Sequence, residues 1–312
     1  MRQRMQAVER QHTADLAQQP GQTDALDPAS RGLSRYVSEY GPYPAWKNST
    51  AKYYPCGEAM YPDLLADLEK AERFIFLEFF IVRTGKMWKG VEDILVRKAA
   101  QGVDVRLIYD DFGSLLGLPS DFVVQMERAH IRCIPFNPVV PLVSLVMNHR
   151  DHRKIVVVDG NTAYTGGINL ADEYINEEER FGYWKDTGVR IEGEAVWSLT
   201  SMFLSMWNYI VHSTEDYSRF MPAQHQKAPF ENDGFVQPYG DSPLDHENVG
   251  ENIYLNIINR AKNYVYIFTP YLIIDHEMLT ALCNAAKDGV DVRIVTPGIP
   301  DKKMIFLLTQ SY

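Results

Sequence analysis

The chain has 312 residues, of which 46% are hydrophobic and 23% charged, and its formal net charge at pH 7 is −10. This length and hydrophobic content suffice for two globular domains with sizeable cores. The negative charge argues against a nucleic-acid enzyme, because such proteins normally present a basic surface to the phosphate backbone. The sequence contains neither a signal peptide nor a run of about 18 apolar residues, so no segment of it is predicted to span a membrane.

Residues 1–40 differ from the rest because they are polar, rich in glutamine and interrupted by proline and glycine. We expect a tail there, with a short helix near 5–18 and a flexible stretch at 19–31. The cysteines are scattered along the chain, at Cys56, Cys133 and Cys283. Their odd number and wide spacing predict reduced thiols facing the cytosol rather than a disulfide framework.

A β-α-β pattern opens the globular part of the chain, and it occurs twice. Ala-Glu-Arg-Phe-Ile-Phe at 71–76 matches Ala-Lys-Asn-Tyr-Val-Tyr at 261–266, and Gly-Val-Asp-Val-Arg at 102–106 recurs at 289–293. Each copy reads strand, connection, helix, glycine, strand, which predicts a mixed or parallel sheet covered by helices. The recurrence at nearly constant spacing indicates an internal duplication.

Two apolar segments are candidates for lipid contact. Residues 136–147 are apolar, interrupted by proline and too short to span a bilayer. They fit a buried core segment equally well. Phe112 together with residues 115–118 forms a second, weaker candidate of the same kind.

The most specific motif follows the first of these segments. Its fixed identities, H-x-K-x4-D and then Gly-Gly-x-Asn, are His152, Lys154, Asp159, Gly166, Gly167 and Asn169. A β-branched run before Asp159 and the turn after it predict a hairpin. Side chains two apart on a strand share a face, so His152 and Lys154 should point the same way. Asp159 should turn to the other face and hold the turn through an Asx-type hydrogen bond.

These residue types suit the cleavage of a phosphodiester, which needs a nucleophile, donors around the phosphoryl oxygens and a proton shuttle. A neutral imidazole can be the nucleophile near neutral pH. Gly166 and Gly167 allow the backbone close to a ligand, and Asn169 adds an amide donor there. A lone histidine–lysine pair would also fit a solvated strand, but fixed identities at fixed spacings favour a functional site.

A metal site is the alternative use of these histidines. His149 and His152 have H-x-x-H spacing, and Asp151 could join them as a ligand. Neither a cysteine nor a third clear ligand lies nearby in the sequence. We therefore expect a reaction without a metal or other cofactor.

The motif resembles the phosphodiester-cleaving motif of the phospholipase D superfamily. Residues 74–81, 102–107, 148–159 and the Trp184 segment also resemble bacterial cardiolipin synthases, and the resemblance runs from about residue 40 to the end of the sequence. It implies an α/β fold, with a mixed β-sheet flanked by helices on both faces and duplicated. Members of that branch usually begin with membrane-spanning helices, and this sequence departs from them at its start.

The resemblance also implies roles for individual residues. His152 would attack phosphorus to give a covalent phosphohistidine, while Lys154 and Asn169 bind phosphate oxygens. The segment Tyr-Trp-Lys-Asp-Thr at 183–187 resembles the one whose carboxylate hydrogen-bonds the far ring nitrogen of the histidine, which nominates Asp186. A second histidine, from a second copy of the motif, would protonate the leaving group.

This second copy is the part that the sequence does not contain. The duplication, with its offsets of 190 residues (71 to 261) and 187 residues (102 to 289), places a second motif histidine near residues 339–342, beyond residue 312. We therefore expect a first catalytic domain at 41–212, a linker at 213–250 and an incomplete second domain at 251–312. A missing C-terminal half, or a second subunit, would complete the site.

The leading hypothesis is a phosphatidyltransferase of the cardiolipin synthase type. It would join two phosphatidylglycerol molecules with release of glycerol, at the cytoplasmic face of the cell membrane, with the membrane surface and not nucleic acid as its partner. Two alternatives stay open. One is a phospholipase D-type hydrolase acting on lipid or nucleic acid, and the other is a non-catalytic remnant that binds phospholipid.

Overall fold

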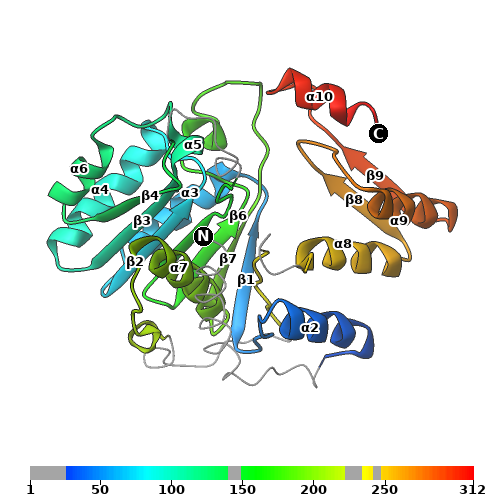
Figure 1. Cartoon of the computed structure of the whole chain (residues 1–312), viewed down its shortest axis with the longest axis horizontal. Coiled ribbons are helices and arrows are strands. Elements are labelled where there is room, and N and C mark those ends of the chain that lie inside the picture. Colours follow the sequence, from blue (N-terminus) through cyan, green and yellow to red (C-terminus); the bar gives the residue numbers. More distant parts are fainter. Residues whose placement is uncertain (1–25, 140–148, 222–233, 242–246) are drawn as a thin grey trace. The chain divides into compact units, whose positions relative to one another are not determined.

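The computed structural model describes residues 26–139, 149–221, 234–241 and 247–312 (Figure 1). The chain folds into two compact units. The first extends to Glu179 and continues from Tyr183 to Tyr239, and the second consists of 180–182 and 240–312. Within the described ranges, no helix is both long enough and apolar enough to cross a bilayer.

The first unit is built on one mixed sheet of seven strands, in the order β1-β7-β6-β5-β2-β3-β4. Its strands are β1 (Ser49–Tyr54), β2 (Phe74–Phe79), β3 (Asp104–Asp110), β4 (Arg132–Phe136), β5 (Ile155–Val158), β6 (Thr162–Gly166) and β7 (Gly188–Gly193). β2, β3 and β4 are parallel, as a β-α-β pattern requires. β5, β6, β7 and β1 continue from β2 as an antiparallel meander, and β5 and β6 form the predicted hairpin.

Helices cover both faces of this sheet, because its central strands are apolar on both sides. The helices of this unit are α2 (Pro28–Tyr40), α3 (Gly57–Leu68), α4 (Lys86–Ala100), α5 (Asp111–Ser114), α6 (Phe122–Arg128) and α7 (Val196–Val211), with two short 3-10 helices, η3 (Asp172–Ile175) and η4 (Tyr217–Phe220). Of these, α3 and α4 pack on one face of the sheet and α7 on the other. Alternation along β2 separates the two cores. Ile75 and Leu77 pack with α3 and α4, whereas Phe76 stacks on Phe203 of α7 with ring centroids 4.5 Å apart.

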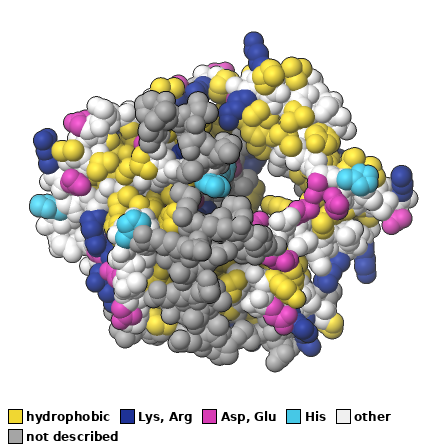
Figure 2. All heavy atoms as spheres, viewed as in Figure 1, with side chains coloured by type: hydrophobic (Ala, Val, Ile, Leu, Met, Phe, Trp, Pro, Cys, Tyr) yellow, Lys and Arg dark blue, Asp and Glu magenta, His cyan; other side chains and the backbone are white. Residues whose placement is uncertain are grey.

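The second unit repeats the opening of the first. It contains α8 (Val249–Arg260), β8 (Tyr264–Phe268), α9 (His276–Lys287), β9 (Asp291–Val295) and α10 (Lys303–Thr309). β8 and β9 are parallel, so α8-β8-α9-β9 follows the order of α3-β2-α4-β3. Apolar side chains are exposed over this unit in Figure 2, with Met304 of α10 80% exposed.

Local geometry agrees with the predicted duplication in detail. Gly102 and Gly289 end the equivalent helices with φ of 87° and 91°, in the left-handed region that glycine tolerates. Arg106 lies 5.0 Å from the ring centroid of Phe76, and Arg293 lies 5.0 Å from that of Tyr266. The second copy is incomplete within the described residues, where its sheet has two strands against seven.

Two segments differ from the expectation. Helix α2 begins at Pro28, inside the stretch predicted to be flexible, while the helix predicted at 5–18 lies outside the described residues. The start of the predicted linker belongs to the first unit, because Tyr217 and Phe220 are buried in its core. The apolar side chains of Tyr217 and Phe220, within an otherwise polar stretch of sequence, could have indicated that this segment packs in the first unit.

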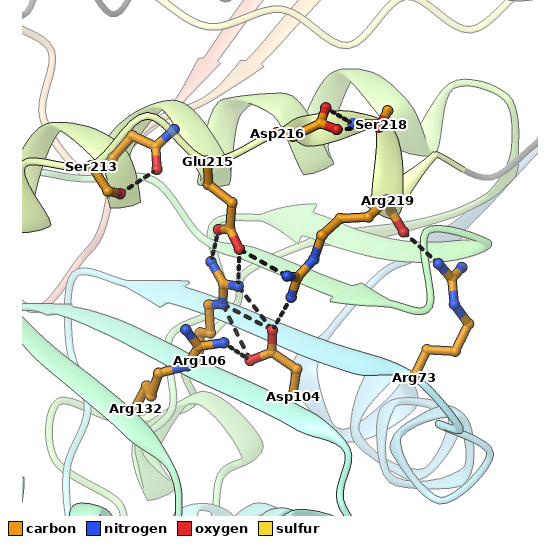
Figure 3. A network of polar contacts seen from close by, with 10 residues as sticks. Arg73, Asp104, Arg106, Arg132, Ser213, Glu215, Asp216, Ser218 and Arg219 are labelled. Carbon is orange, nitrogen blue, oxygen red and sulfur yellow. Dashed lines mark hydrogen bonds and ion pairs between the residues drawn. The ribbon is translucent and has the colours of Figure 1, made fainter.

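The same segment contributes to a buried ionic network (Figure 3). The guanidinium of Arg106 is fully buried and donates to Glu215 at 2.9 Å and to Asp104 at 2.8 Å. A buried guanidinium is tolerated only when carboxylates of this kind compensate it. Glu215 thus connects the chain after α7 to β3.

Candidate active site

The motif residues gather at one edge of the first sheet. β2 and β3 end there, the antiparallel β5 begins there, β6 ends there and β7 begins there. His152 and Lys154 precede β5, Asn169 follows β6, and Asp186 precedes β7. The sheet order therefore brings together residues that are up to 34 positions apart (152 to 186) in the sequence.

His152 and Lys154 lie side by side, as predicted. Lys154 Nζ is 3.3 Å from Nδ1 of His152 and donates a hydrogen bond of 2.6 Å to the carbonyl oxygen of His152. Both lie against Phe80, whose ring centroid is 4.8 Å from that of the imidazole and 5.5 Å from Nζ. The two residues lie just before β5 rather than within it.

The two side chains differ in exposure. His152 is exposed, whereas Lys154 is only 4% exposed. Burial lowers the pKa of Lys154 to about 8, although the nearby carboxylates of Asp151, Asp186 and Asp110 oppose this shift. A buried ammonium of this kind would be stabilised further by an anion. The pair therefore combines a reachable imidazole with a cation that favours binding of an anionic group.

Asn169 is held in one orientation. It is 2% exposed, its Oδ1 accepts a hydrogen bond from the backbone N–H of Ile81 at 2.9 Å, and its Nδ2 donates to the hydroxyl of Tyr174 at 2.8 Å. An amide nitrogen has two hydrogens, and the bond to Tyr174 uses one of them. These contacts fix the amide plane at the same edge as His152.

Gly166 and Gly167 face protein rather than open space. A Cβ on Gly167 would lie 1.9 Å from Oδ1 of Asp186, and a Cβ on Gly166, with φ of 144°, would lie 2.4 Å from the carbonyl oxygen of Thr187. The close neighbour of both is the chain that enters β7, so their small size is required for the placement of Asp186. The expected approach of their backbone to a ligand stays a prediction.

Asp186 is a partly buried carboxyl group beside Lys154. Its Oδ1 accepts a hydrogen bond of 2.8 Å from the N–H of Thr187. Burial raises its pKa, while the Thr187 N–H and the positive charge of Lys154 act in the opposite direction. Asp186 thus lies against Gly167 and interacts electrostatically with Lys154. Its expected contact with the ring of His152 stays a prediction.

Asp159 has a structural environment, but its partners differ from the expected ones. Its carboxylate accepts three backbone hydrogen bonds of 2.8 Å, from the N–H groups of Glu72, Arg73 and Phe74. The carboxylate therefore holds the start of β2 and not the turn between β5 and β6. Sequence spacing could not reveal this, because the contact depends on the pairing of β2 with β5.

Three further residues of this edge were missed by sequence reasoning: Phe80, Asp110 and Tyr174. Asp110 is fully buried, accepts from Phe112 N and Gly113 N at 3.0 Å, and accepts from Asp151 N at 3.0 Å. It therefore connects the turn after β3 to the residue before His152. Its place at the carboxyl end of a parallel strand was a usable signal, since ligands bind at that edge in α/β sheets.

Comparison with known proteins identifies relatives of this chain. A family model described as cardiolipin synthase, PLD-like domain, matches residues 64–207 and 254–311. An uncharacterized protein of Streptococcus mutans is 50% identical over 281 residues, which are 90% of this chain and 60% of that protein. A cardiolipin synthase of Geobacillus kaustophilus is 36% identical over 291 residues, 92% of this chain and 57% of that enzyme. The chain thus spans about 60% of the length of these relatives.

A solved structure shares the fold at low sequence identity. The phosphatidylserine synthase of Haemophilus influenzae superposes with a TM-score of 0.57 at 14% identity, covering 85% of this chain and 65% of that one. The similarity concerns the sheet and its helices. It agrees with the mixed α/β architecture that the sequence predicted.

Proposed function

Because the chain belongs to the phospholipase D-like family of cardiolipin synthases, we propose that it is a phosphatidyltransferase that joins two phosphatidylglycerol molecules and releases glycerol. The observation that carries this proposal is the pairing of an exposed imidazole with a buried ammonium, 3.3 Å apart, at the ligand-binding edge of the sheet. The relatedness to phospholipid-transferring enzymes supports the choice of a lipid substrate.

The reaction proceeds in two displacements at phosphorus. In the first, a ring nitrogen of His152 attacks, an N–P bond forms, and the P–O bond to the departing glycerol breaks. In the second, a primary hydroxyl of another phosphatidylglycerol attacks and gives its proton to the group that protonated the glycerol, a P–O bond forms, and the N–P bond breaks. No oxidant or reductant is needed. A covalent intermediate of this kind divides one difficult step into two easier ones.

Lys154 and Asn169 stabilise the charge on the phosphoryl oxygens. Burial makes the ammonium of Lys154 costly before substrate binds and lowers its pKa to about 8. A bound phosphodiester anion removes much of that cost, so substrate binding restores the full charge. Donors held in place before the reaction, as Asn169 is by Ile81 and Tyr174, need no reorganisation in the transition state.

A second set of motif residues supplies the general acid in this proposal. The repeated α-β-α-β order of the second unit supports a duplicated architecture, and the curated relatives are longer than this chain. The partner set would come from a further half or from a second subunit. General acids commonly contribute roughly 10²–10⁴-fold, so these 312 residues alone should react slowly.

An apolar turn beside the site provides the proposed contact with the membrane surface. Phe112, Leu115 and Leu116 are 55%, 52% and 96% exposed, respectively. The turn is fixed to the site, because Gly113 packs against the carbonyl of Phe80, whose ring touches His152. Insertion of this turn into one leaflet would bring lipid phosphates to the imidazole. Most of the other candidate, residues 136–147, lies outside the described residues.

Hydrolysis is the second candidate, since the exposure of His152 makes it accessible to water. The two reactions are separated by incubating the chain with vesicles of labelled phosphatidylglycerol and quantifying the products. Both reactions release glycerol, but transfer gives cardiolipin as the lipid product, whereas hydrolysis gives phosphatidic acid. Faster cleavage of short DNA than of lipid would overturn the choice of a lipid substrate. On this proposal the chain works at the cytoplasmic face of the membrane.

A further inference from the structure

A buried acidic residue lies directly behind the catalytic segment. Glu78 is in β2, opposite Ile155 of β5, and it is fully buried. Neither of its carboxylate oxygens accepts a hydrogen bond from any residue that the structure describes. Its charged neighbour is Arg153, whose Nη2 lies 2.7 Å from Oε1. A fully buried carboxylate without hydrogen bonds is costly, so its protonation state needs an explanation.

The alternation of side chains places Glu78 on the reverse side of the catalytic pair. Glu78 shares a face of β2 with Phe76, which packs under α7, and Arg153 reaches that same face. Asp151 joins them, because its Oδ1 accepts a bond of 3.1 Å from Nε of Arg153. The two residues flanking His152 along the chain are therefore both tied to one buried cluster.

Both carboxylates of this cluster are paired with one guanidinium, that of Arg153. The ammonium of Lys154 also attracts Asp151, so Asp151 is the better compensated of the two carboxylates. Asp151 Oδ2 also has no donor among the described residues. Two carboxylates only accept hydrogen bonds, so they can bond to each other only when one is protonated. A single shared proton would satisfy an oxygen of each residue.

The electrostatics favour Glu78 as the protonated partner. Burial raises the pKa of Glu78 well above its ordinary value, and the charge of Asp151 raises it further, against the opposing effect of Arg153. Burial would also raise the pKa of Asp151, but the positive charge of Arg153 and the hydrogen bonds from Arg153 lower it. The other groups facing the cluster are Tyr43, next to Arg153, Asp110, which accepts from the N–H of Asp151, and Lys154, whose ammonium attracts Asp151.

We propose that Glu78 is a positioning residue, a neutral carboxylic acid that donates a hydrogen bond to Asp151 and, together with Arg153, holds the backbone on both sides of His152. Only the expected effect of Glu78 on the reaction rate rests on the proposed function. The shared proton itself is a property of the folded chain. Because Glu78 acts from the far side of the segment, it touches no substrate.

The protonated carboxyl group can be observed without substrate. Its carbonyl stretching band should be present in the infrared spectrum of the folded chain at pH 7 and absent in E78Q. The matched control is D67N, because Asp67 is also a buried carboxylate but is bonded to Arg190, which helps to hold its pKa below the ordinary value. The band should be unchanged there. An identical band in the wild type and in E78Q would overturn the proposal.

Stability supplies a second readout with a definite sign. The pKa of Glu78 is raised in the folded chain, so its contribution is fully present below the ordinary value of 4.5 and is lost as the pH rises through the folded pKa. E78Q keeps a neutral donor and removes that dependence. Its melting temperature should therefore rise relative to the wild type as the pH increases above 4.5. Parallel curves would contradict a shared proton.

The positioning role is tested on His152 itself. E78Q should leave the imidazole NMR resonances of His152 and the rate of phosphoenzyme formation near wild type, whereas E78A should shift those resonances and lower that rate by about 10²-fold, because small misplacements of a reacting group have effects of this size. If E78A fails to fold, D151A removes the acceptor and should shift the same resonances. Resonances unchanged in a folded E78A or D151A chain would overturn the role even if no lipid transfer were found.

Discussion

Lys154 Nζ lies 3.3 Å from Nδ1 of His152, with the lysine side chain buried and the imidazole exposed. This relationship sets the pH behaviour of the site, because burial lowers the pKa of Lys154 to about 8. Phosphoenzyme formation should therefore decline as the pH rises through about 8, since the ammonium is then lost. K154R should keep its rate above that pH, because a guanidinium stays charged. An alkaline limb shared by K154R and the wild type would assign the decline to another group.

The contribution of Lys154 to the stability of the folded chain should increase as the pH rises above about 8, whereas phosphoenzyme formation declines. The folded pKa of Lys154 lies below its ordinary value of 10.5, so the unfolded chain binds more protons between pH 8 and 10.5. The melting temperature of the wild type relative to K154M should rise across this window. Thermal unfolding at matched pH values measures the difference. A relative fall would mean that the ammonium is stabilised in the folded site.

Asp159 should matter for folding rather than for chemistry. D159A leaves three backbone N–H groups at the start of β2 without their acceptor, and each unsatisfied buried group costs roughly 1–3 kcal/mol. We expect the free energy of unfolding to fall by about 3 kcal/mol, measured by denaturant titration. D121A, which loses an exposed carboxylate bonded to Gln125, is the control. Loss of phosphoenzyme formation in a fully folded D159A chain would show that Asp159 also takes part in the chemistry.

The small size of Gly167 should be required for activity. A Cβ there would lie 1.9 Å from Oδ1 of Asp186, so G167A must displace that carboxylate. We expect G167A to slow phosphoenzyme formation about as much as D186A, and the double variant to be no slower than either. G298A is the control, because nothing lies within 4 Å of its added Cβ. Additive losses in the double variant would show that Gly167 acts independently of Asp186.

The turn after β3 should bind lipid. L115Q/L116Q removes two exposed apolar side chains next to the site and should weaken binding to phosphatidylglycerol vesicles by about tenfold or more, since burying one leucine contributes roughly 1.5–3 kcal/mol. V124Q, on the exposed surface of α6, is the matched control. Equal vesicle binding by both variants would place the membrane contact elsewhere. Loss of self-association instead would mark the turn as a protein interface.

The sequence predicted the local part of this site and missed the long-range part. Two-residue alternation was enough to place His152 beside Lys154, and the repeat predicted the β-α-β order of the second unit. The partners of Asp159 depend on the pairing of β2 with β5, which no spacing encodes. Glu78 was visible as a charged residue within an apolar strand. Its partners became evident only when the sheet placed it behind residues 151–153.

The most direct test of the account is to trap the phosphohistidine intermediate. The chain is incubated with phosphatidylglycerol labelled in its phosphatidyl group, quenched, and assayed for acid-labile label on the protein. The wild type and H149A, which changes the neighbouring exposed histidine, should both slowly acquire label on His152, whereas H152A should carry none. Label that forms in H152A at the wild-type rate, or wild-type label that lies on a residue other than His152, would contradict the assignment of His152 as the nucleophile.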